Sequence, residues 1–291
     1  RDEREHRSFD ALGAFTVTAG LAILVYALVD ATQAGWGSTQ TVVLLSLAVL
    51  LLAAFVVTEL RHRMPLVPFS IFKLRTLTGA NVVGLMVGAS LFSMFFFISL
   101  YMQQVLGYGP LKAGFAYLPL ALTIIVSAGI ASQLVTKVGF KPVLIGGLAL
   151  IAVGLLWFSQ VSAGGGYVSD ILFPSLLAAA GLGFSFVPVT IGAVAGTSAD
   201  ESGLASGLIN TSQQIGGALG LAILATVANS RTDGLVEAGA RPSPGALTEG
   251  FQAAFLTGAG FAVLGIIAAL TLIKTADSEA MKGAEAVPVA A

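Results

Sequence analysis

Residues 142–158 read PVLIGGLALIAVGLLWF, without a single charged side chain, and the first hydroxyl after them belongs to Ser159. An α-helix needs roughly 20 apolar residues to cross a hydrocarbon core about 30 Å thick. Seven more apolar runs of similar length occur along the chain, and nearly all charges lie in the short segments between the runs. Alternation with period two, the mark of a membrane β-barrel, is absent. The sequence therefore predicts an all-α integral membrane protein with eight transmembrane helices.

The predicted spans fall into a group of two followed by a group of six. They cover residues 9–29, 41–58, 77–101, 111–135, 142–158, 171–194, 203–228 and 251–273. The longest inner connection, 59–76, is basic and separates the pair in 9–58 from the six spans in 77–273. The longest outer connection, 229–250, is rich in Gly, Pro and Ser and is expected to be a solvated loop. We therefore expect two linker helices followed by a six-helix bundle.

The overall composition excludes several classes of protein. Hydrophobic residues make up 56% of the chain and charged residues only 10%, against about 25% charged in an average soluble domain. A net charge of −1 favours no nucleic-acid partner, and the absence of Cys excludes disulfides and thiolate metal sites. His6 and His62 lie outside the apolar runs, so no metal or bound cofactor is expected. Membrane lipid is the predicted surrounding partner.

Lys and Arg are distributed unevenly between the two sides of the membrane, and cytoplasmic loops carry the excess. If the amino-terminal end lies inside, the inner segments hold Arg1, Arg4, Arg7, Arg61, Arg63, Lys73, Arg75, Lys137, Lys141, Lys274 and Lys282. The outer segments then hold only Lys112, Arg231 and Arg241. We expect a multi-pass cell-membrane protein with a cytoplasmic linker at 1–8 and a cytoplasmic tail at 274–291. That tail has too few hydrophobic residues to fold and is expected to be disordered.

Polar side chains gather on one face of the span 203–228. Ser206, Asn210, Gln213, Gln214 and Gly217 recur at intervals of three and four residues, which places them on one side of a helix. Two interpretations stand at this point: the amides line a substrate path, or they hydrogen-bond to neighbouring helices. GxxxG spacing on the same helix predicts close helix packing at Gly203, Gly207, Gly216 and Gly220.

Aromatic and sparse polar side chains mark two further spans as candidates for the substrate path. In the span 77–101 and just after it, the candidates are Asn81, Ser93, Phe96, Tyr101 and Gln103. In the span 171–194 they are Phe184 and Phe186, beside Pro188. Aromatic faces with few polar groups suit a pocket for bulky apolar or cationic molecules. Packing between helices is the alternative for each Phe.

Acidic residues mark helix ends rather than the membrane interior. The carboxyl groups at the predicted ends are those of Asp10, Asp30, Glu59 and Asp170. Ser198 and Glu201 form a capping-box pattern before the span 203–228. Because a carboxylate deep in a membrane usually marks a proton or ion path, a proton-coupled transporter would carry its main titrating acid before Arg1. That residue is neither an initiator Met nor the start of a signal peptide, so we expect it to be internal to a longer polypeptide.

Two stretches resemble the drug:proton antiporters with fourteen spans in the major facilitator superfamily. One is YMQQVLGY at 101–108 with its continuation to Pro119, and the other is GLASGLIN at 203–210 followed by QIGGALG at 214–220. The loop 132–141 resembles a degenerate second copy of the superfamily's inner-loop signature. Lys137, Gly139 and Lys141 match that signature in kind, whereas Ser132, Thr136 and Phe140 depart from it.

The resemblance implies that this chain is the linker pair plus the carboxyl-terminal half, built of two three-helix repeats. A missing amino-terminal half would be its partner, with a small-molecule substrate bound between the halves and alternating access by rocking. The proton gradient would supply the energy, without a cofactor. Spans 77–101, 111–135, 171–194 and 203–228 would face the cavity. Spans 142–158 and 251–273 would face lipid, as their lack of polar side chains also suggests.

Three other functions are alternatives to drug export. An intramembrane enzyme would need a base beside Ser206, and no span contains His, Cys or a deep carboxylate, so no catalytic residue is predicted. Proton-coupled uptake of a small solute and a non-transporting sensor or scaffold subunit stay open as alternatives.

Overall fold

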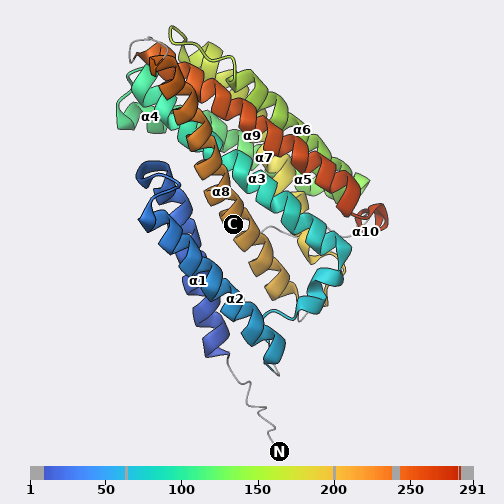
Figure 1. The fold of residues 1–291 in the computed structure, drawn as a ribbon. Helices are drawn as coiled ribbons and strands as arrows, with labels where there is room; N and C mark the ends of the chain where they lie inside the picture. Colours follow the sequence, from blue (N-terminus) through green and yellow to red (C-terminus); the bar gives the residue numbers. More distant parts are fainter. Residues whose placement is uncertain (1–9, 63–64, 199–200, 238–242, 281, 283–291) are drawn as a thin grey trace, which may run out of the picture. The chain divides into compact units, whose positions relative to one another are not determined.

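The computed structural model describes residues 10–62, 65–198, 201–237, 243–280 and 282, with the side chains of Gln33, Ser93 and Glu237 left out. It contains two compact units, Arg1–Lys73 and Leu74–Ala291. No strand occurs in the described residues, which are helical except for short connections (Figure 1).

The first unit is a helical hairpin. It consists of α1 (Ala11–Ala34), α2 (Thr39–Arg61) and the short 3₁₀ helix η1 (Phe69–Lys73). The Asp10 carboxylate caps α1 by accepting a hydrogen bond from the backbone N–H of Gly13 at 2.8 Å. Ser38 caps α2 in the same way, accepting from the backbone N–H of Thr41. Between the helices, Gly35 has a φ of +89°, which only glycine adopts readily and which lets the chain reverse.

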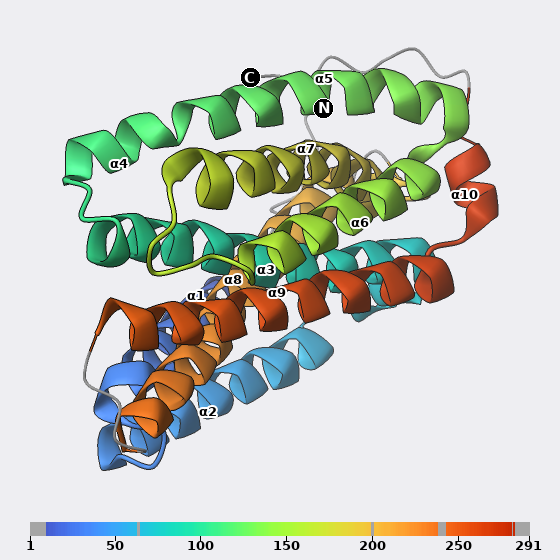
Figure 2. The same cartoon turned by 90° about the horizontal axis from the view of Figure 1, so that it is seen from above.

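The second unit is a helical bundle. Its elements are α3 (Arg75–Leu100), η2 (Tyr101–Val105), α4 (Pro110–Ala116), α5 (Leu118–Val138), α6 (Phe140–Phe158), η3 (Tyr167–Leu172), α7 (Phe173–Val194), α8 (Ser202–Glu237), α9 (Pro244–Leu272) and α10 (Thr275–Glu279). The elements η2 and η3 are π-helical. Helix α3 contacts α7, α8 and α9, whereas α5 packs chiefly on α7 (Figure 2). In the apolar stretches of α3 and α7, 59% and 61% of residues are buried, against 22% in that of α4 and α5, so α3 and α7 form the centre.

Glycine allows the helices of this bundle to approach closely. A Cβ added to Gly181 of α7 would lie 2.6 Å from the carbonyl oxygen of Gly147 in α6. A Cβ on Gly154 would lie 2.8 Å from the backbone nitrogen of Ala178. The two backbones are therefore in direct contact, as is common where helices pack through small residues in membranes.

Seven helical stretches among the described residues are long and apolar enough to cross a membrane. They are Ala11–Thr32, Thr39–Arg61, Arg75–Val105, Pro110–Val138, Phe140–Phe158, Tyr167–Val194 and Pro244–Leu272. Helix α8 corresponds to the remaining predicted span but is not among them. Although α8 has 36 residues, Asn210, Gln213 and Gln214 make it the most polar of the long helices. The all-helical membrane fold is confirmed, with seven clear spans.

Two predictions about connections were wrong. The predicted loop 229–250 is largely helical, because α8 continues to Glu237 and α9 begins at Pro244. An ion pair of 2.8 Å between Arg231 and Glu249 joins these helix ends, and the Thr232 hydroxyl donates to the carbonyl of Ala228. The predicted disordered tail also contains a helix, α10, in which Ser278 is buried. Residues 283–291 lie outside the described part of the chain.

Candidate functional site at the contact of α3 and α8

Helices α3 and α8 cross with their backbones in contact. A Cβ on Gly216 of α8 would lie 2.1 Å from the carbonyl oxygen of Leu85, and one on Gly220 would lie 2.4 Å from Cα of Ala89. On α3, a Cβ on Gly88 would lie 2.2 Å from the carbonyl oxygen of Gln213. No other residue type fits at these positions without moving a helix. The pair Gly84 and Gly88 has the same GxxxG spacing and was overlooked in the sequence.

Gly203 and Gly207 are placed differently. A Cβ at either position would have nothing within 4 Å. Within this structure they therefore do not mediate helix packing, contrary to the prediction that treated all four glycines of α8 alike. GxxxG spacing repeats along the helix, but of the four glycines only Gly216 and Gly220 lie against the backbone of α3.

Buried polar side chains lie where the two helices meet. Asn81 is 8% exposed; its amide donates to the carbonyl of Leu77 at 2.9 Å, and its Oδ1 accepts from the Ser212 hydroxyl at 2.8 Å. Gln213 is 6% exposed, and its Nε2 is buried with no hydrogen-bond partner. A buried unsatisfied amide costs about 1–3 kcal/mol. Such an exception in a native structure calls for an explanation, and a functional role is one of those known.

The other amides of α8 are accessible. Asn210 and Gln214 are exposed, and Ser206 is half-buried. The Asn210 amide donates to the carbonyl of Ser206 at 3.0 Å. The predicted polar face is thus divided, because Gln213 turns toward α3 while Asn210 and Gln214, four residues apart, remain on the open side. Ser212, which bonds Asn81, was not singled out from the sequence.

Aromatic side chains flank this contact. Phe96 is 41% exposed and Phe92 48%, and a Cβ on Gly217 would lie 2.6 Å from the Phe92 ring. On α7, Phe186 is 44% exposed, and Gln103 in η2 is exposed. The side chain of Ser93 lies outside the described part of the chain. Phe92 and Phe96 present accessible apolar surface on α3, the helix that also carries Asn81.

Tyr101 lies apart from this site. It is 1% exposed, and its hydroxyl donates to the carbonyl of Ser162 at 2.7 Å and to Asp170 Oδ2 at 3.0 Å. The backbone N–H and hydroxyl of Ser162 also donate to this carboxylate. Tyr101 therefore joins η2 to η3 and the loop before it, and it does not line an open path in this structure. The two π-helical turns meet at this contact, and π-helical turns are frequent at functional sites.

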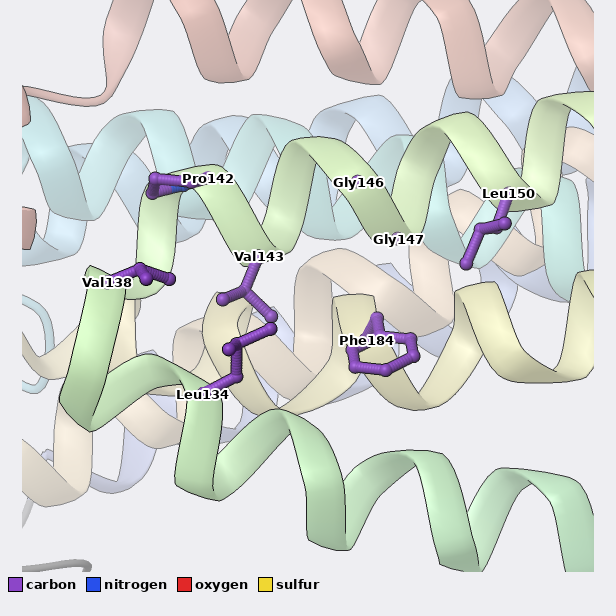
Figure 3. A pocket seen from close by; sticks show the side chains of 8 residues that line it. All are labelled: Leu134, Val138, Pro142, Val143, Gly146, Gly147, Leu150 and Phe184. Atoms are coloured by element: carbon purple, nitrogen blue, oxygen red, sulfur yellow. The ribbon is translucent and has the colours of Figure 1, made fainter.

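Phe184 also points away from the α3–α8 contact. It lines an apolar groove of about 410 Å³ between α5, α6 and α7 (Figure 3). Leu134 and Val138 of α5 form one wall, and Val143 and Leu150 of α6 form the other. None of its lining side chains carries a polar group, so this groove offers apolar contact only.

The predicted inner-loop motif consists of Lys137, Gly139 and Lys141, and its Lys141 binds the end of α9. Lys141 Nζ donates to the carbonyl oxygens of Leu270 at 3.1 Å and Ile273 at 2.7 Å, and its backbone N–H donates to the Ser278 hydroxyl at 2.9 Å. Gly139 has a φ of +88°, and a Cβ there would lie 2.6 Å from the same hydroxyl. An ammonium at a helix carboxyl end is favourable because it faces the negative end of the helix dipole.

Other residues near the inner-loop motif differ from Lys141 in their contacts. Lys137 is exposed. At the start of α3, the Thr76 hydroxyl donates to Asp277 of α10, and the Arg75 guanidinium donates to the carbonyl of Thr271 at 2.6 Å. The ends of α3 and α6 thus both bind the end of α9 and α10. The sequence contained no signal for Thr76, Asp277 or Ser278.

At the start of α8, Glu201 Oε2 accepts from the backbone N–H of Ser198 at 3.1 Å and from its hydroxyl at 2.8 Å. These hydrogen bonds, the one from the backbone first, hold the pKa of Glu201 below its ordinary value. The predicted capping pattern therefore contains the contact from Glu201 back to Ser198. The two residues between them lie outside the described part.

The sequence of this chain was compared with those of known protein families and individual proteins. Residues 4–221 match the family described as the Major Facilitator Superfamily. Over 227 residues the chain is 37% identical to the cephamycin export protein CmcT of Amycolatopsis lactamdurans. The alignment covers 77% of this chain and 47% of that protein. Over 268 residues it is 33% identical to the puromycin resistance protein pur8 of Streptomyces alboniger, covering 90% and 53%. Over 235 residues it is 32% identical to the tetracenomycin C resistance and export protein of Streptomyces glaucescens, covering 79% and 43%. The chain spans about half the length of the curated relatives it matches.

Proposed function

This chain belongs to the major facilitator superfamily, and on that premise we propose that it forms part of a secondary active exporter of hydrophobic or amphipathic drugs or metabolites. The names of its relatives describe export of, or resistance to, antibiotics. Because the chain spans about half of these proteins, we propose that it works with an amino-terminal half of similar size. Alternating access between the two halves, driven by the proton gradient, is the mechanism that the family resemblance favours.

In this proposal α8 also spans the membrane, which brings the number of spans to eight. Its 36 residues extend about 54 Å at 1.5 Å per residue, which exceeds the hydrocarbon thickness of about 30 Å. It packs along α3 and α9, two helices that are apolar enough to span. Low hydropathy is expected of a helix that faces a water-filled cavity, because polar side chains in a membrane face protein or water. The bundle would then consist of two repeats: α3 with α4–α5 and α6, and α7 with α8 and α9.

We place the substrate path along the open side of the α3–α8 contact. The observation that carries this placement is the pair of exposed amides, Asn210 and Gln214, beside the buried and unpaired Nε2 of Gln213. Phe92 and Phe96 add accessible aromatic surface on α3. A few hydrogen-bonding groups within aromatic surroundings suit large apolar solutes. The proposed path leaves out Tyr101, whose hydroxyl bonds Asp170, and Phe184, which lines the apolar groove between α5, α6 and α7.

The membrane orientation is part of the same proposal. We place the protein in the cell membrane with both ends of this chain in the cytoplasm, because the predicted inner segments hold most of the Lys and Arg residues. The contact of Lys141 with the end of α9 would then lie on the cytoplasmic side.

Transport by the full-length protein in energised inside-out vesicles tests this function. A dye or antibiotic substrate should accumulate in the vesicles and leak out when the pH gradient is collapsed. Asn210→Leu and Gln214→Leu should each lower the initial rate about tenfold, the factor that corresponds to about 1.4 kcal/mol. Thr257→Val on α9 is the matched control, because that hydroxyl donates within its own helix to Ala253. Accumulation in right-side-out vesicles instead would indicate uptake, and no gradient-dependent flux in either would indicate a sensor or scaffold.

A further inference from the structure

The apolar groove between α5, α6 and α7 is accessible from the side of the bundle. Helix α5 packs far more on α7 than on α6, which leaves a space between α5 and α6. On α5, Leu134 is 36% exposed and Val138 is 40% exposed. Gly146 of α6 also lines the groove and is exposed (Figure 3). A Cβ at Gly146 would have nothing within 4 Å, so the groove has room for a further apolar group.

The length of the groove matches one leaflet of a membrane. Along α6 it extends from Pro142, two residues after the start of the helix, to Leu150. At 1.5 Å per residue this distance is about 12 Å, and half of the hydrocarbon core is about 15 Å. Because Phe140–Phe158 is apolar enough to span the membrane, the groove leads from the end of a span toward its middle. An acyl chain of a lipid follows the same course.

A second cavity adjoins the groove at the end of the span. Its volume is about 420 Å³, and Val138 and Pro142 line both spaces. We call it the basic pocket. Its other lining residues are mostly polar and come from α6, α10 and the residue Lys282 after α10; they are Lys141, Ile145, Thr275, Ser278, Glu279 and Lys282. An apolar groove thus adjoins a pocket with charged and hydroxyl groups.

The described lining residues of the basic pocket carry more positive than negative charge. The charged side chains among them are Lys141, Lys282 and Glu279. Lys141 Nζ donates to two backbone carbonyl oxygens and, at 3.4 Å, to the Thr275 hydroxyl. These acceptors are neutral and do not cancel the charge of the ammonium group. Glu279 pairs with Lys282 at 3.5 Å between exposed side chains, a contact of little strength. The pocket therefore favours an anion, to which the hydroxyls of Thr275 and Ser278 can also donate.

An anionic group joined to an apolar chain is the chemistry of an anionic phospholipid. We propose that the groove and the basic pocket together bind one such lipid, with an acyl chain against Gly146 and Phe184 and the headgroup phosphate beside Lys141 and Lys282. Basic pockets between membrane helices are suited to anionic headgroups. A free phosphate would leave the groove empty, and an uncharged apolar molecule would leave the lysines unused, whereas a phospholipid uses both. This site stands on the geometry of the bundle and does not depend on the proposed export.

Photolabelling of the full-length protein in phosphatidylcholine nanodiscs tests the proposal. The probe is phosphatidylglycerol with a diazirine in one acyl chain, and mass spectrometry of peptides should locate its label within residues 134–150 and at Phe184. The same diazirine chain on phosphatidylcholine should label these residues about tenfold less, because each ammonium group near an anionic headgroup favours binding. The apolar surface of α9 around Leu256, Gly260 and Leu264, whose described lining residues are uncharged, is the internal control. Both probes should label it equally.

Two substitutions separate the groove from the basic pocket. Gly146→Leu fills the groove from a position where a Cβ meets open space, so labelling within 134–150 should fall to the level of the α9 surface. Gly129→Leu on α5 also meets open space but does not line the groove, and it should label as the wild type does. Lys282→Gln keeps the groove and should lower the preference for phosphatidylglycerol about fivefold, the effect of one ammonium group. Thermal unfolding of each variant checks that it remains folded.

Three results would overturn the proposal. Equal labelling of the groove by the two probes would show that the headgroup charge is not recognised. No labelling of the groove by either probe would show that another part of the full-length protein covers it. Loss of the phosphatidylglycerol label in the presence of excess glycerol phosphate, which has the anionic group without the chains, would assign the basic pocket to a soluble anion. We expect glycerol phosphate to leave the label unchanged.

Discussion

Lys141 Nζ donates a hydrogen bond of 2.7 Å to the carbonyl oxygen of Ile273. The ammonium at the start of α6 thereby caps the end of α9, more than a hundred residues later in the chain. The second bond, to the carbonyl of Leu270, satisfies another acceptor that the end of a helix leaves unpaired. Because Lys141 joins α6 to the end of α9, we expect even a conservative substitution at this position to lower the stability of the bundle.

Lys141→Met should lower the stability of the bundle by about 1–3 kcal/mol, the range for a hydrogen bond that involves a charged group. The side chain keeps its length, but the carbonyls of Leu270 and Ile273 lose their donor. Thermal unfolding of the purified protein measures the effect. Lys137→Met, at an exposed position four residues earlier, is the control and should change little. Equal losses for the two variants would contradict a capping role for Lys141.

Gly216→Ala and Gly220→Ala should destabilise the protein, because each methyl group would meet the backbone of α3. Insertion of a methyl into a packed contact typically costs about 1–3 kcal/mol. Gly203→Ala and Gly207→Ala add the same methyl on the same helix in open space, and they should be neutral or stabilising by about 0.5–1 kcal/mol through helix propensity. Unfolding midpoints of the four variants separate these cases. Similar behaviour of all four would show that α8 does not pack on α3 in this way.

Tyr101→Phe should destabilise the end of α3 by about 1 kcal/mol, because the hydroxyl no longer donates to the half-buried Asp170 carboxylate or to the carbonyl of Ser162. Amide hydrogen exchange should rise in η2 and η3 together, since the hydroxyl joins them. Tyr26→Phe, at a position that is 56% exposed, should leave exchange and stability unchanged. Faster exchange confined to η2 would mean that the hydroxyl does not connect the two π-helical turns.

The start of α8 should depend on pH through Glu201. Its pKa is lowered by the hydrogen bonds from Ser198, so the folded state favours the ionised form. This contribution is fully present above the ordinary Glu pKa of about 4.3. It is lost as the pH falls through the lower folded value. Protection of the first turn of α8 in hydrogen exchange should fall in that window, and Glu201→Gln should abolish the dependence. A dependence that persists in Glu201→Gln would assign it to another group.

Helix positions followed well from the sequence because a membrane span needs about 20 mostly apolar residues. The apolar run 142–158 differs from α6 (Phe140–Phe158) by two residues. Between the apolar runs, span length and polarity do not predict the structure. An ion pair between Arg231 and Glu249 joins the helical ends of α8 and α9, and α10 contacts Lys141 and Thr76. Such contacts join residues far apart in sequence and leave no local pattern.

The candidate site followed from the sequence only in part. Spacing placed the amides of α8 on one face, but an α-helical face is wide, and Gln213 turns toward α3 while Asn210 and Gln214 stay accessible. Tyr101 is an aromatic residue with a polar group, as expected of a pocket residue, yet its hydroxyl donates a hydrogen bond to Asp170.

The most direct test of the central claim is the water accessibility of α8. This chain contains no Cys, so single cysteines can be introduced into a cysteine-free full-length protein and labelled in membranes with a water-soluble thiol reagent. We expect Asn210→Cys and Gln214→Cys to be labelled and to be protected by a transported substrate, while Ile209→Cys, at a position that is 2% exposed, is not labelled. If positions 210 and 214 react as slowly as position 209, with and without substrate, the open side of α8 is not a substrate path.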